Sequence, residues 1–194
     1  MDKRALRERL RKVRREHVAS LDDTTRALLF RRPPSPVMAM VPDGAVIGLY
    51  HALPTEASAA GYARFLSEKG HVIALPRFAD RDAPMEFAAW SDPWGDADLA
   101  VGPFGMLQPD AEADLLTPDI VFVPLVGFTA SGARLGQGAG HYDRWLARNP
   151  AAVPIGMAWD AQRVDLLPLE PHDRPMAAIV TPTRLYGPFS EREA

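Results

Sequence analysis

Apolar and polar positions alternate along the start of the chain in a way that predicts two helices. Residues 2–19 carry an apolar stripe at helical spacing on an otherwise basic segment, formed by Leu6, Leu10, Val13 and His17. Ser20, followed by Asp23, can cap a second helix that we expect to run to about residue 32. The prolines within residues 33–36 should end that helix.

Apolar runs further along the chain predict strands that alternate with helices. A strand at 45–50 is followed by a helix at 56–69, which Gly70 closes, and by a strand at 72–76. Such a βαβ unit implies parallel strands joined by a right-handed crossover. The remaining expected elements are strands at 119–124, 155–159 and 177–181, a helix at 142–148 and a short helix or turn at 161–166. The pattern predicts an α/β fold with a mainly parallel sheet.

The segment 77–118 has a weaker pattern, and we expect it to be mostly loop with a short strand at 85–90. Connections of this length commonly form lids or ligand-binding excursions. Its aromatic side chains suit either a flat heterocyclic ligand or a small satellite core, and they are Phe87, Trp90, Trp94 and Phe104. A polar loop is expected at 168–173, and the tail after Pro188 should fray.

A glycine-rich stretch, 134–143, follows the apolar run 119–128 and precedes the predicted helix 142–148. Glycines at 136, 138 and 140 allow the backbone to turn sharply and to bring N–H groups close to an anion. A strand, a glycine loop and a helix N-terminus in this order can bind phosphate. The same spacing also suits an ordinary tight turn. Neither the P-loop pattern nor the dinucleotide pattern is present, since no Lys-Ser or Lys-Thr follows and His141 replaces the third glycine.

Composition narrows the class of protein. The length of 194 residues predicts one domain over 1–194, with the basic helical segment 2–32 packed on an α/β core. No apolar run is long enough for a membrane span, and no secretory signal is evident, so we expect a cytoplasmic protein without a membrane partner. The absence of cysteine excludes disulfides and thiol catalysis. A net charge of −3 argues against a general nucleic-acid binder.

Two further features suggest a ligand site. Eight of the first fifteen residues are basic, which suits either a polyanionic ligand or a solvated helix face. Within this segment Lys3 and Arg7 lie one helical turn apart and could jointly reach a phosphate tail. Glu56 lies at the carboxyl end of the first predicted strand, where open α/β sheets place ligands, although a glutamate there also stabilises a helix N-terminus.

The chain resembles the 5-formyltetrahydrofolate cyclo-ligase family, also called methenyltetrahydrofolate synthetases. The most specific match is Asp119-x-Val-x-x-Pro124, followed by Phe128, Gly132 and Arg134-Leu-Gly-x-Gly-x-Gly-x-Tyr-Asp143. The similarity is collinear over nearly the whole chain and includes residues 3–7, Glu56 and the segments 70–76, 85–90, 104–109 and 168–173. It implies a three-layer α/β/α fold similar to NagB/RpiA/CoA-transferase-like folds.

The resemblance implies an ATP- and Mg2+-dependent conversion of 5-formyltetrahydrofolate to 5,10-methenyltetrahydrofolate, with release of ADP and phosphate. In that chemistry the γ-phosphoryl group moves to the formyl oxygen, and N10 attacks the resulting iminophosphate. Catalysis is then mainly positioning and neutralisation of charge. Both substrates are small molecules, and we expect a monomer or a weak homodimer.

Matching positions carry the family's site residues onto this sequence. Lys3 and Arg7 correspond to contacts with ATP phosphates. The nucleotide loop corresponds to Arg134, Leu135, Gly136, Gln137, Gly138, Ala139, Gly140, His141 and Tyr142. Asp143 and Asp173 correspond to Mg2+ ligands, and two carboxylates with phosphate oxygens and waters suit that ion. His51 and Glu56 correspond to the folate side.

Arg134 and Tyr142 are the expected catalytic residues, with Tyr142 where the loop and the pterin meet. Each aspartate also has a plainer interpretation: Asp143 as a first-turn helix residue and Asp173 as a turn former. Tyr142 also suits ordinary packing. His141 could protonate departing phosphate or be structural.

The sequence also departs from the family pattern. Many members carry a basic residue at the position of Gln137, a lysine at that of Ala139 and an aromatic residue at that of His141. The two missing charges predict a weaker affinity for the nucleotide or a changed preference among nucleotides. They also motivate a rival hypothesis, a non-catalytic folate- or RNA-binding relative on the same scaffold. A third hypothesis is another phosphoryl transferase of the kinase type.

Overall fold

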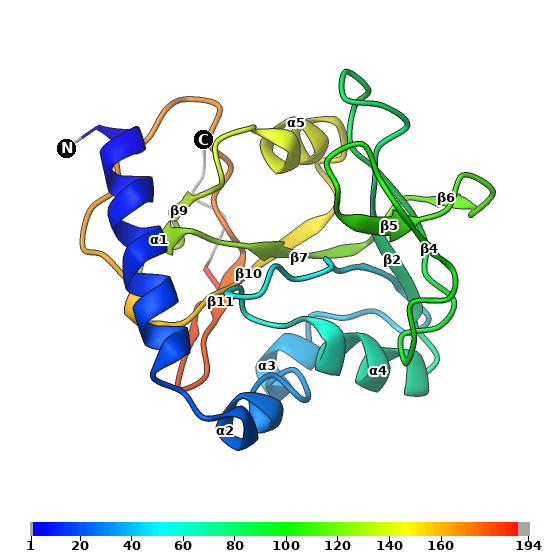
Figure 1. Ribbon diagram of the computed structural model, residues 1–194, viewed down its shortest axis with the longest axis horizontal. Coiled ribbons are helices and arrows are strands. Elements are labelled where there is room, and N and C mark those ends of the chain that lie inside the picture. The colour runs from blue at the N-terminus through cyan, green and yellow to red at the C-terminus, as the bar shows by residue number, and fades with distance from the viewer. Residues whose placement is uncertain (1, 190–194) are drawn as a thin grey trace.

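The computed structural model describes residues 2–189, which build one continuous eight-stranded sheet with helices on both faces (Figure 1). The tail expected to fray lies, from residue 190 on, outside the described residues. That residues 1–194 form a single domain stays a prediction. No helix within residues 2–189 is long and apolar enough to cross a membrane.

The central sheet has the strand order β12-β11-β10-β7-β1-β2-β3-β6. Its strands are β1 (Val46–Gly48), β2 (Val72–Arg77), β3 (Glu86–Ala89), β6 (Leu115–Leu116), β7 (Ile120–Pro124), β10 (Val153–Met157), β11 (Ala178–Val180) and β12 (Leu185–Tyr186). The five strands from β11 to β2 are parallel, whereas β12, β3 and β6 pair antiparallel at the edges. The predicted mainly parallel α/β sheet is confirmed.

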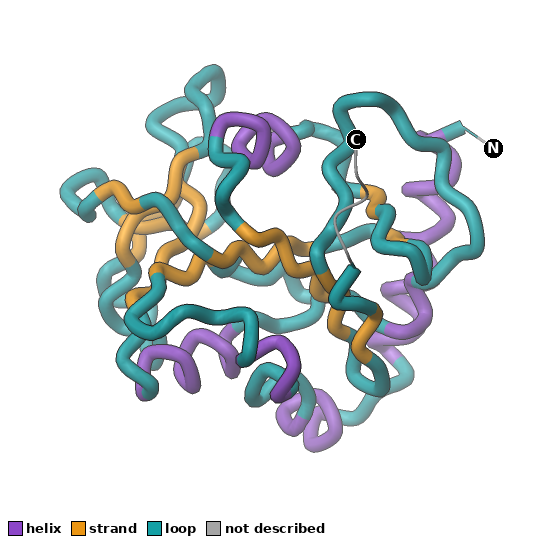
Figure 2. The backbone as a smooth tube through the Cα atoms, turned by 180° about the vertical axis from the view of Figure 1, so that it is seen from behind, coloured by secondary structure: helices purple, strands orange, loops and turns teal. Residues whose placement is uncertain are grey.

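Helices cover both faces of the sheet. They are α1 (Lys3–Ala19), α2 (Asp23–Leu28), α3 (Ser35–Met38), α4 (Ala60–Glu68) and α5 (His141–Arg148), with a short 3-10 helix at Asp160–Gln162. Figures 1 and 2 show α5 on one face, α2, α3 and α4 on the other, and α1 along one end of the sheet. This arrangement is the predicted three-layer α/β/α architecture.

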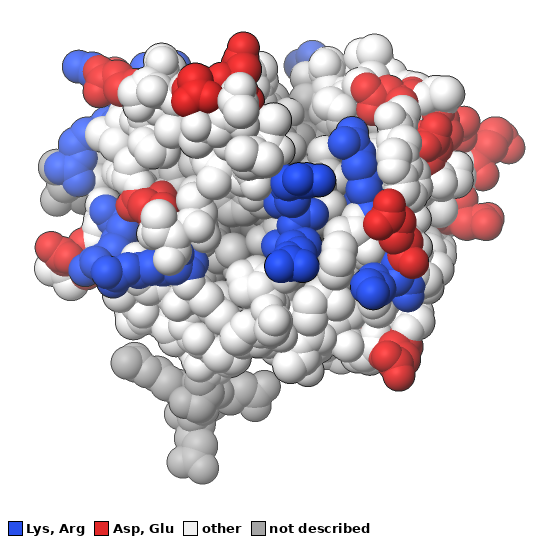
Figure 3. Space-filling view, turned by 90° about the horizontal axis from the view of Figure 1, so that it is seen from below, with Lys and Arg blue, Asp and Glu red and all other residues white. Residues whose placement is uncertain are grey.

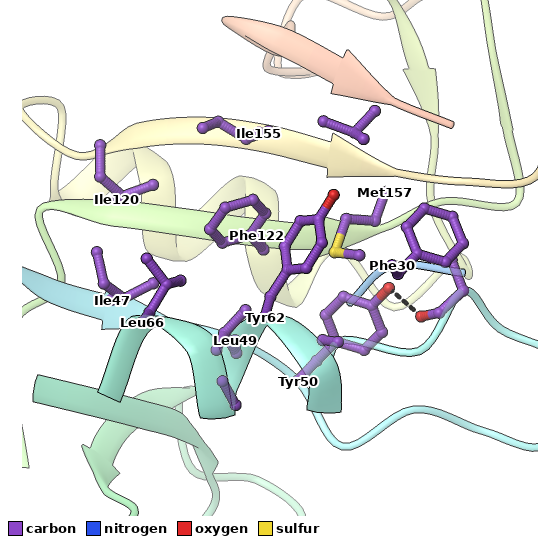
Figure 4. Close-up of a cluster of buried hydrophobic side chains, with 14 of the residues drawn as sticks. Phe30, Ile47, Leu49, Tyr50, Tyr62, Leu66, Ile120, Phe122, Ile155 and Met157 are labelled. Carbon is purple, nitrogen blue, oxygen red and sulfur yellow. Dashed lines mark hydrogen bonds between the residues drawn. The ribbon is translucent and has the colours of Figure 1, made fainter. Parts of the chain in front are cut away.

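Side-chain alternation along the strands creates a separate core on each face. On β7, Ile120 and Phe122 belong to the cluster beneath α4, whereas Val121 and Val123 belong to the cluster beneath α5. The first cluster contains an edge-to-face contact between the rings of Tyr62 and Phe122, whose centroids are 5.4 Å apart (Figure 4). Each helical layer is therefore fixed to the sheet independently.

Helix α1 packs through a buried stripe that differs in part from the predicted one. Leu6 and Leu10 are buried as expected, but the stripe continues through Arg14 and Val18, while Val13 and His17 are only partly buried. Leu6 and Leu10 pack against Val126, which precedes the glycine-rich stretch, and against Leu135, which lies within it. The buried stripe keeps i, i+4 spacing because the C-terminal end of α1 faces the core beneath α4, to which Val18 belongs.

Two small ribbons complete the fold. The strands β4 (Leu99–Val101) and β5 (Leu107–Pro109) form one, and β8 (Gly127–Phe128) and β9 (Arg134–Leu135) form the other. The segment 77–118 contains four short strands, β3 to β6, but most of its residues lie in loops and turns, so the expectation of mostly loop is confirmed. The predicted strand at 85–90 is confirmed as β3. Short strands without strict alternation, as in β4 and β5, leave little periodic signal.

The second predicted helix was wrong in its extent. Helix α2 begins after Asp22, whose side chain accepts a 2.7 Å hydrogen bond from the N–H of Thr25, and ends at Leu28. Phe30 then adopts a left-handed backbone with φ of 54°, which breaks the helix before the prolines. The proline run starts α3, because Pro36 lies in a first turn where its missing N–H costs nothing.

The helix predicted at 56–69 begins only at Ala60. Glu56 instead lies in a turn, where its own N–H donates to the carbonyl of Leu53 at 2.9 Å. The interpretation of Glu56 as a first-turn helix residue was therefore wrong.

Charged side chains are dispersed over the surface. Figure 3 shows basic groups in separate clusters on the face seen from below, with acidic side chains between them. That face does not present one continuous basic surface.

The packing of α1 predicts the effect of shortening Leu10, which is 3% exposed between α1 and the ribbon. Leu10→Ala should lower the free energy of unfolding by about 2–5 kcal/mol, because it leaves a cavity under α1. Leu28→Ala is the control, since Leu28 is 60% exposed and its truncation should change stability by less than about 0.5 kcal/mol. Urea unfolding followed by circular dichroism measures both, and equal effects would contradict this packing.

Candidate functional site

A cavity of ≈ 470 Å³ opens at the carboxyl ends of the parallel strands. Tyr50 and His51 follow β1, Phe78 follows β2 and Pro124 ends β7, and all four line this cavity. The crossover helix after β1 lies on one face of the sheet and the helix after β7 on the other (Figure 1). The cavity therefore lies at the topological switch point between β1 and β7, where open α/β sheets bind ligands.

The structure brings every sequence-predicted site residue to this cavity. Its lining includes Lys3, Arg7, His51, Glu56, Arg134, Leu135, Gly136, Gln137, Gly138, Ala139, Gly140, His141, Tyr142, Asp143 and Asp173. These residues come from α1, the loop after β1, the glycine-rich stretch and the late loop at 168–173. Their individual roles stay predictions.

The glycine-rich stretch turns from β9 into α5 through two left-handed residues. Gly138 has φ of 115° and Gly140 has φ of 69°, both in the region that side chains other than glycine rarely adopt. Gly140 caps α5, so the positive end of the helix faces the cavity. The tight-turn and phosphate-loop interpretations thus describe one and the same segment.

Helix α1 holds this glycine-rich stretch in place by hydrogen bonds to its carbonyls. The Nε of Arg7 donates to the carbonyl of Gly136 at 2.9 Å, and the Nη2 of Arg11 donates to that of Gln137 at 2.8 Å. No residue within 2–189 accepts a hydrogen bond from either Nη of Arg7. One edge of that guanidinium positions the stretch, and the other remains available to a ligand in the cavity.

Lys3 forms two ion pairs within the cavity wall. Its Nζ lies 2.7 Å from Asp173 Oδ2 and 2.6 Å from Glu170 Oε2. Burial raises the pKa of Asp173, but the hydrogen bonds from Lys3 and from the N–H of Glu170, together with the charge of Lys3, outweigh this effect and hold the pKa below its ordinary value. Asp173 therefore stays ionised and forms the turn expected for it, accepting a bond from the N–H of Glu170 at 2.7 Å.

Asp143 is paired with Arg134 inside the same cavity. Its Oδ1 accepts hydrogen bonds from the Nη2 of Arg134 and, at 3.2 Å, from the N–H of Arg174. Asp143 also lies in the first turn of α5, as its plainer interpretation required. The Nε of Arg134 is buried without an acceptor among the described residues. An unpaired buried donor beside a cavity is a feature that a ligand can satisfy.

The acidic groups have the donor chemistry of a magnesium site. Within residues 2–189 no hydrogen bond reaches Oδ2 of Asp143 or Oδ1 of Asp173, so each carboxylate keeps one oxygen available. Oxygen ligands of this kind fit Mg2+. A tighter cluster is formed by Glu170, His172 and Asp173, whose ligand atoms lie within 4.8 Å of one another. Asp143 does not belong to that cluster.

The expected folate side lies across the cavity. Glu56 is 8% exposed, and its Oε1 accepts a 2.8 Å hydrogen bond from the Nε2 of Gln137. His51 is partly exposed and its Nε2 lies 3.8 Å from Asp96 Oδ1. Burial raises the pKa of Tyr142 well above its ordinary value, so its hydroxyl stays protonated at neutral pH.

Aromatic rings at the cavity include some that the sequence reasoning missed. Phe78, Phe104 and His141 pack together, with ring centroids 4.9 Å apart for Phe78 and Phe104 and 4.8 Å apart for Phe78 and His141. Of the aromatic candidates in 77–118, only Phe104 lines the cavity, whereas Phe87 and Trp90 are buried in the core. Those two residues belong to the main cores on the two faces of the sheet, so neither the ligand contact nor the satellite core expected for them was right.

Several lining residues had a signal in the sequence that was not used. Tyr50 lies two residues after β1 and Phe78 directly follows β2, so the rule that selected Glu56 also selects them. Met106, Glu170 and His172 come from irregular segments without periodicity, and only the folded chain places them. His141 keeps a neutral ring, because burial lowers its pKa and Arg144 lowers it further.

Comparison with known proteins gives one consistent result. The model of the 5-formyltetrahydrofolate cyclo-ligase family matches residues 1–182. The 5-formyltetrahydrofolate cyclo-ligase of Haemophilus influenzae is 37% identical over 91 residues, which span 44% of this chain and 49% of that protein. The protein of the same name from Mycolicibacterium smegmatis is 32% identical over 153 residues, 76% of this chain and 74% of the relative.

A solved structure extends the similarity over the whole chain. The 5,10-methenyltetrahydrofolate synthetase of Aquifex aeolicus matches with a TM-score of 0.74 and 26% identity, over 100% of this chain and 96% of that one. With the cavity at the switch point and the glycine-rich stretch as its wall, these matches place the chain in a known group. The chain belongs to the 5-formyltetrahydrofolate cyclo-ligase family.

Proposed function

We propose that the chain converts 5-formyltetrahydrofolate and ATP to 5,10-methenyltetrahydrofolate, ADP and phosphate. One observation carries this proposal: a single cavity of ≈ 470 Å³ is lined both by the glycine-rich stretch and by the aromatic and acidic side chains across from it. A reaction that transfers a phosphoryl group between two bound substrates needs both sites in one space. Family membership supports the same reaction.

In this proposal the nucleotide's phosphates bind against the glycine-rich stretch. The N–H groups of residues 136–140 and the N-terminus of α5 supply positive electrostatic potential. Lys3 and Arg134 each exchange a carboxylate partner for phosphate oxygens, while Arg7 adds its unpaired Nη groups. A Mg2+ ion, when bound by Asp143 and Asp173, neutralises phosphate charge.

The folate occupies the part of the same cavity lined by Glu56, Phe78 and Phe104. The cluster of Phe78, Phe104 and His141 offers a surface on which a flat ring can pack. Glu56 accepts hydrogen bonds from ring N–H groups, and the protonated hydroxyl of Tyr142 donates to an oxygen of the substrate. These contacts place the formyl oxygen next to the glycine-rich stretch.

The chemistry then requires little covalent participation by the protein. The γ-phosphoryl group moves to the formyl oxygen, and its bond to ADP breaks. The formyl oxygen, a poor leaving group on its own, can then depart as phosphate. N10 attacks the activated carbon, the carbon–oxygen bond breaks, and the N10 proton and phosphate are lost. Arg134 stabilises the charge that develops on the transferred group, and its buried Nε is a donor suited to that task.

The rival hypotheses have less support. A non-catalytic folate or RNA binder has no need for two carboxylates held in the nucleotide half of the cavity, and the family match does not favour it. A kinase-like transferase would not require the aromatic cluster formed by Phe78, Phe104 and His141.

The proposed reaction can be tested directly with the purified protein. Purified protein mixed with 5-formyltetrahydrofolate and MgATP should produce the methenyl compound, which is followed by its near-ultraviolet absorbance. Omission of ATP, or removal of Mg2+ by a chelator, should abolish product formation. No product above a protein-free control, across several nucleotides and divalent metals, would contradict the proposed function.

Asp143→Asn should lower turnover by at least about 10-fold, because the amide cannot replace a charged oxygen ligand or the partner of Arg134. The variant should also need more Mg2+ for half-maximal rate. Asp165→Asn is the matched control, since Asp165 is 94% exposed in a surface pair and should retain full activity. Unchanged turnover and Mg2+ dependence in Asp143→Asn would remove this residue from the metal site.

Ala139→Lys tests the missing loop charge. Ala139 is exposed at the cavity wall, so a lysine there should lower KM for ATP by about threefold at low salt, with a smaller gain at high salt. Ala151→Lys adds the same charge beyond the far end of α5 and serves as control. An equal change of KM in both variants would show that net charge, and not this position, is responsible.

A further inference from the structure

Arg14 is the one charged side chain among the residues that form the buried stripe of α1. It is 5% exposed and lies one turn from Leu10 and one turn from Val18. Its Nη1 is 3.6 Å from Oε1 of Glu56, and both side chains are almost fully buried. Removing two charges from water is costly, so an apolar residue would serve the packing of α1 at least as well.

The contact between Arg14 and Glu56 is an ion pair without a hydrogen bond. Neither Nε nor Nη1 of Arg14 has a hydrogen-bond partner among the described residues. The guanidinium therefore attracts the carboxylate without occupying its acceptor sites. This leaves Glu56 free to accept bonds from other groups at the cavity.

Glu56 uses those acceptor sites to join two parts of the cavity wall. Its Oε2 accepts from the N–H of Leu53 at 3.0 Å, and its Oε1 accepts from the Nε2 of Gln137 at 2.8 Å. Arg11 donates to the Oε1 of Gln137 at 3.0 Å, which orients the amide so that its NH2 faces Glu56. The carboxylate thus lies between the loop after β1 and the glycine-rich stretch, and Arg14 holds it from behind.

We propose that Arg14 is a positioning residue for the folate half of the site. It does not line the cavity, so it acts through Glu56, which it holds by charge at the place where the carboxylate meets Gln137 and the substrate. This inference rests on the proposed function, because it takes Glu56 as the group that accepts hydrogen bonds from the folate ring.

Separate measurements of the affinity for each substrate distinguish a positioning role of Arg14 from a purely structural one. Binding of 5-formyltetrahydrofolate and of a non-hydrolysable ATP analogue is measured separately by titration calorimetry. Arg14→Met should weaken folate binding by on the order of 10-fold through misplacement of Glu56, with the ATP analogue affected much less. Arg14→Lys, which keeps a cation, should recover part of the loss, and Arg15→Met, at an exposed neighbouring position, should change neither affinity.

A double-mutant cycle tests whether Arg14 acts through Glu56. In the Glu56→Gln background, Arg14→Met should cause no further loss of folate affinity. Wild-type-like folate binding by Arg14→Met, or the same loss in both backgrounds, would overturn the inference. If Arg14→Met does not fold, Arg14→Lys enters the same cycle, with a smaller expected loss that should again vanish in the Glu56→Gln background.

A thermal readout keeps the inference distinct from the proposed function. If the unaltered chain binds no 5-formyltetrahydrofolate, the proposed function fails. The pairing itself is then read from the unfolding temperatures of the unaltered chain, the two single variants and the double variant. The double variant should lose less than the sum of the single losses, because it leaves no buried charge unpaired. Additive losses would overturn the coupling.

Discussion

The docking of α1 onto the β8–β9 ribbon is the contact on which the site depends. Leu10 lies so close to Gly127 that a β-carbon added there would be 2.4 Å from Leu10 Cδ1, so the ribbon accommodates the Leu10 side chain only because position 127 is a glycine. This contact fixes the position of α1, which runs along one end of the sheet (Figure 1). Lys3, Arg7 and Arg14 then reach three different parts of the cavity wall.

The same docking explains why so much charge lies inside the protein. Each carboxylate assigned to the nucleotide half has an internal cation: Arg134 for Asp143 and Lys3 for Asp173. Internal pairing orients these groups before a ligand arrives, which lowers the cost of organising the site on binding. Substrate binding then exchanges one set of ion pairs for another instead of burying new charges.

The sequence predicted the parts of the fold that have strong periodicity. The parallel strands β1, β2, β7, β10 and β11, together with α1 and α5, follow from apolar runs and from the glycines that interrupt them. The antiparallel edge strands β6 and β12, of two residues each, were missed because so few positions carry no measurable alternation. Helix starts were misjudged where an internal turn, as at Glu56, replaced the first turn of a helix.

The residues that motif and topology selected lie together at one cavity, and their roles stay predictions. The glycine-rich stretch and the pair of Lys3 and Arg7 could be found from spacing, and the resemblance to the family added Asp173, which lies far away in the sequence. No sequence pattern could reveal which buried charged side chains form ion pairs. Arg14 has the same sequence surroundings as the exposed basic residues of α1, and only the packed helix shows that it faces Glu56. Burial of a single charge depends on tertiary neighbours, which a one-dimensional pattern does not contain.

The central claim is that one cavity holds both substrates, with the glycine-rich stretch as the wall that binds the phosphates. A crystal structure of the chain with Mg2+, a non-hydrolysable ATP analogue and 5-formyltetrahydrofolate tests it most directly. The account predicts that the phosphates lie against residues 136–140 and that the pteridine ring lies beside Glu56 and Phe104. A nucleotide bound outside this cavity, or a folate bound away from Glu56, would contradict it.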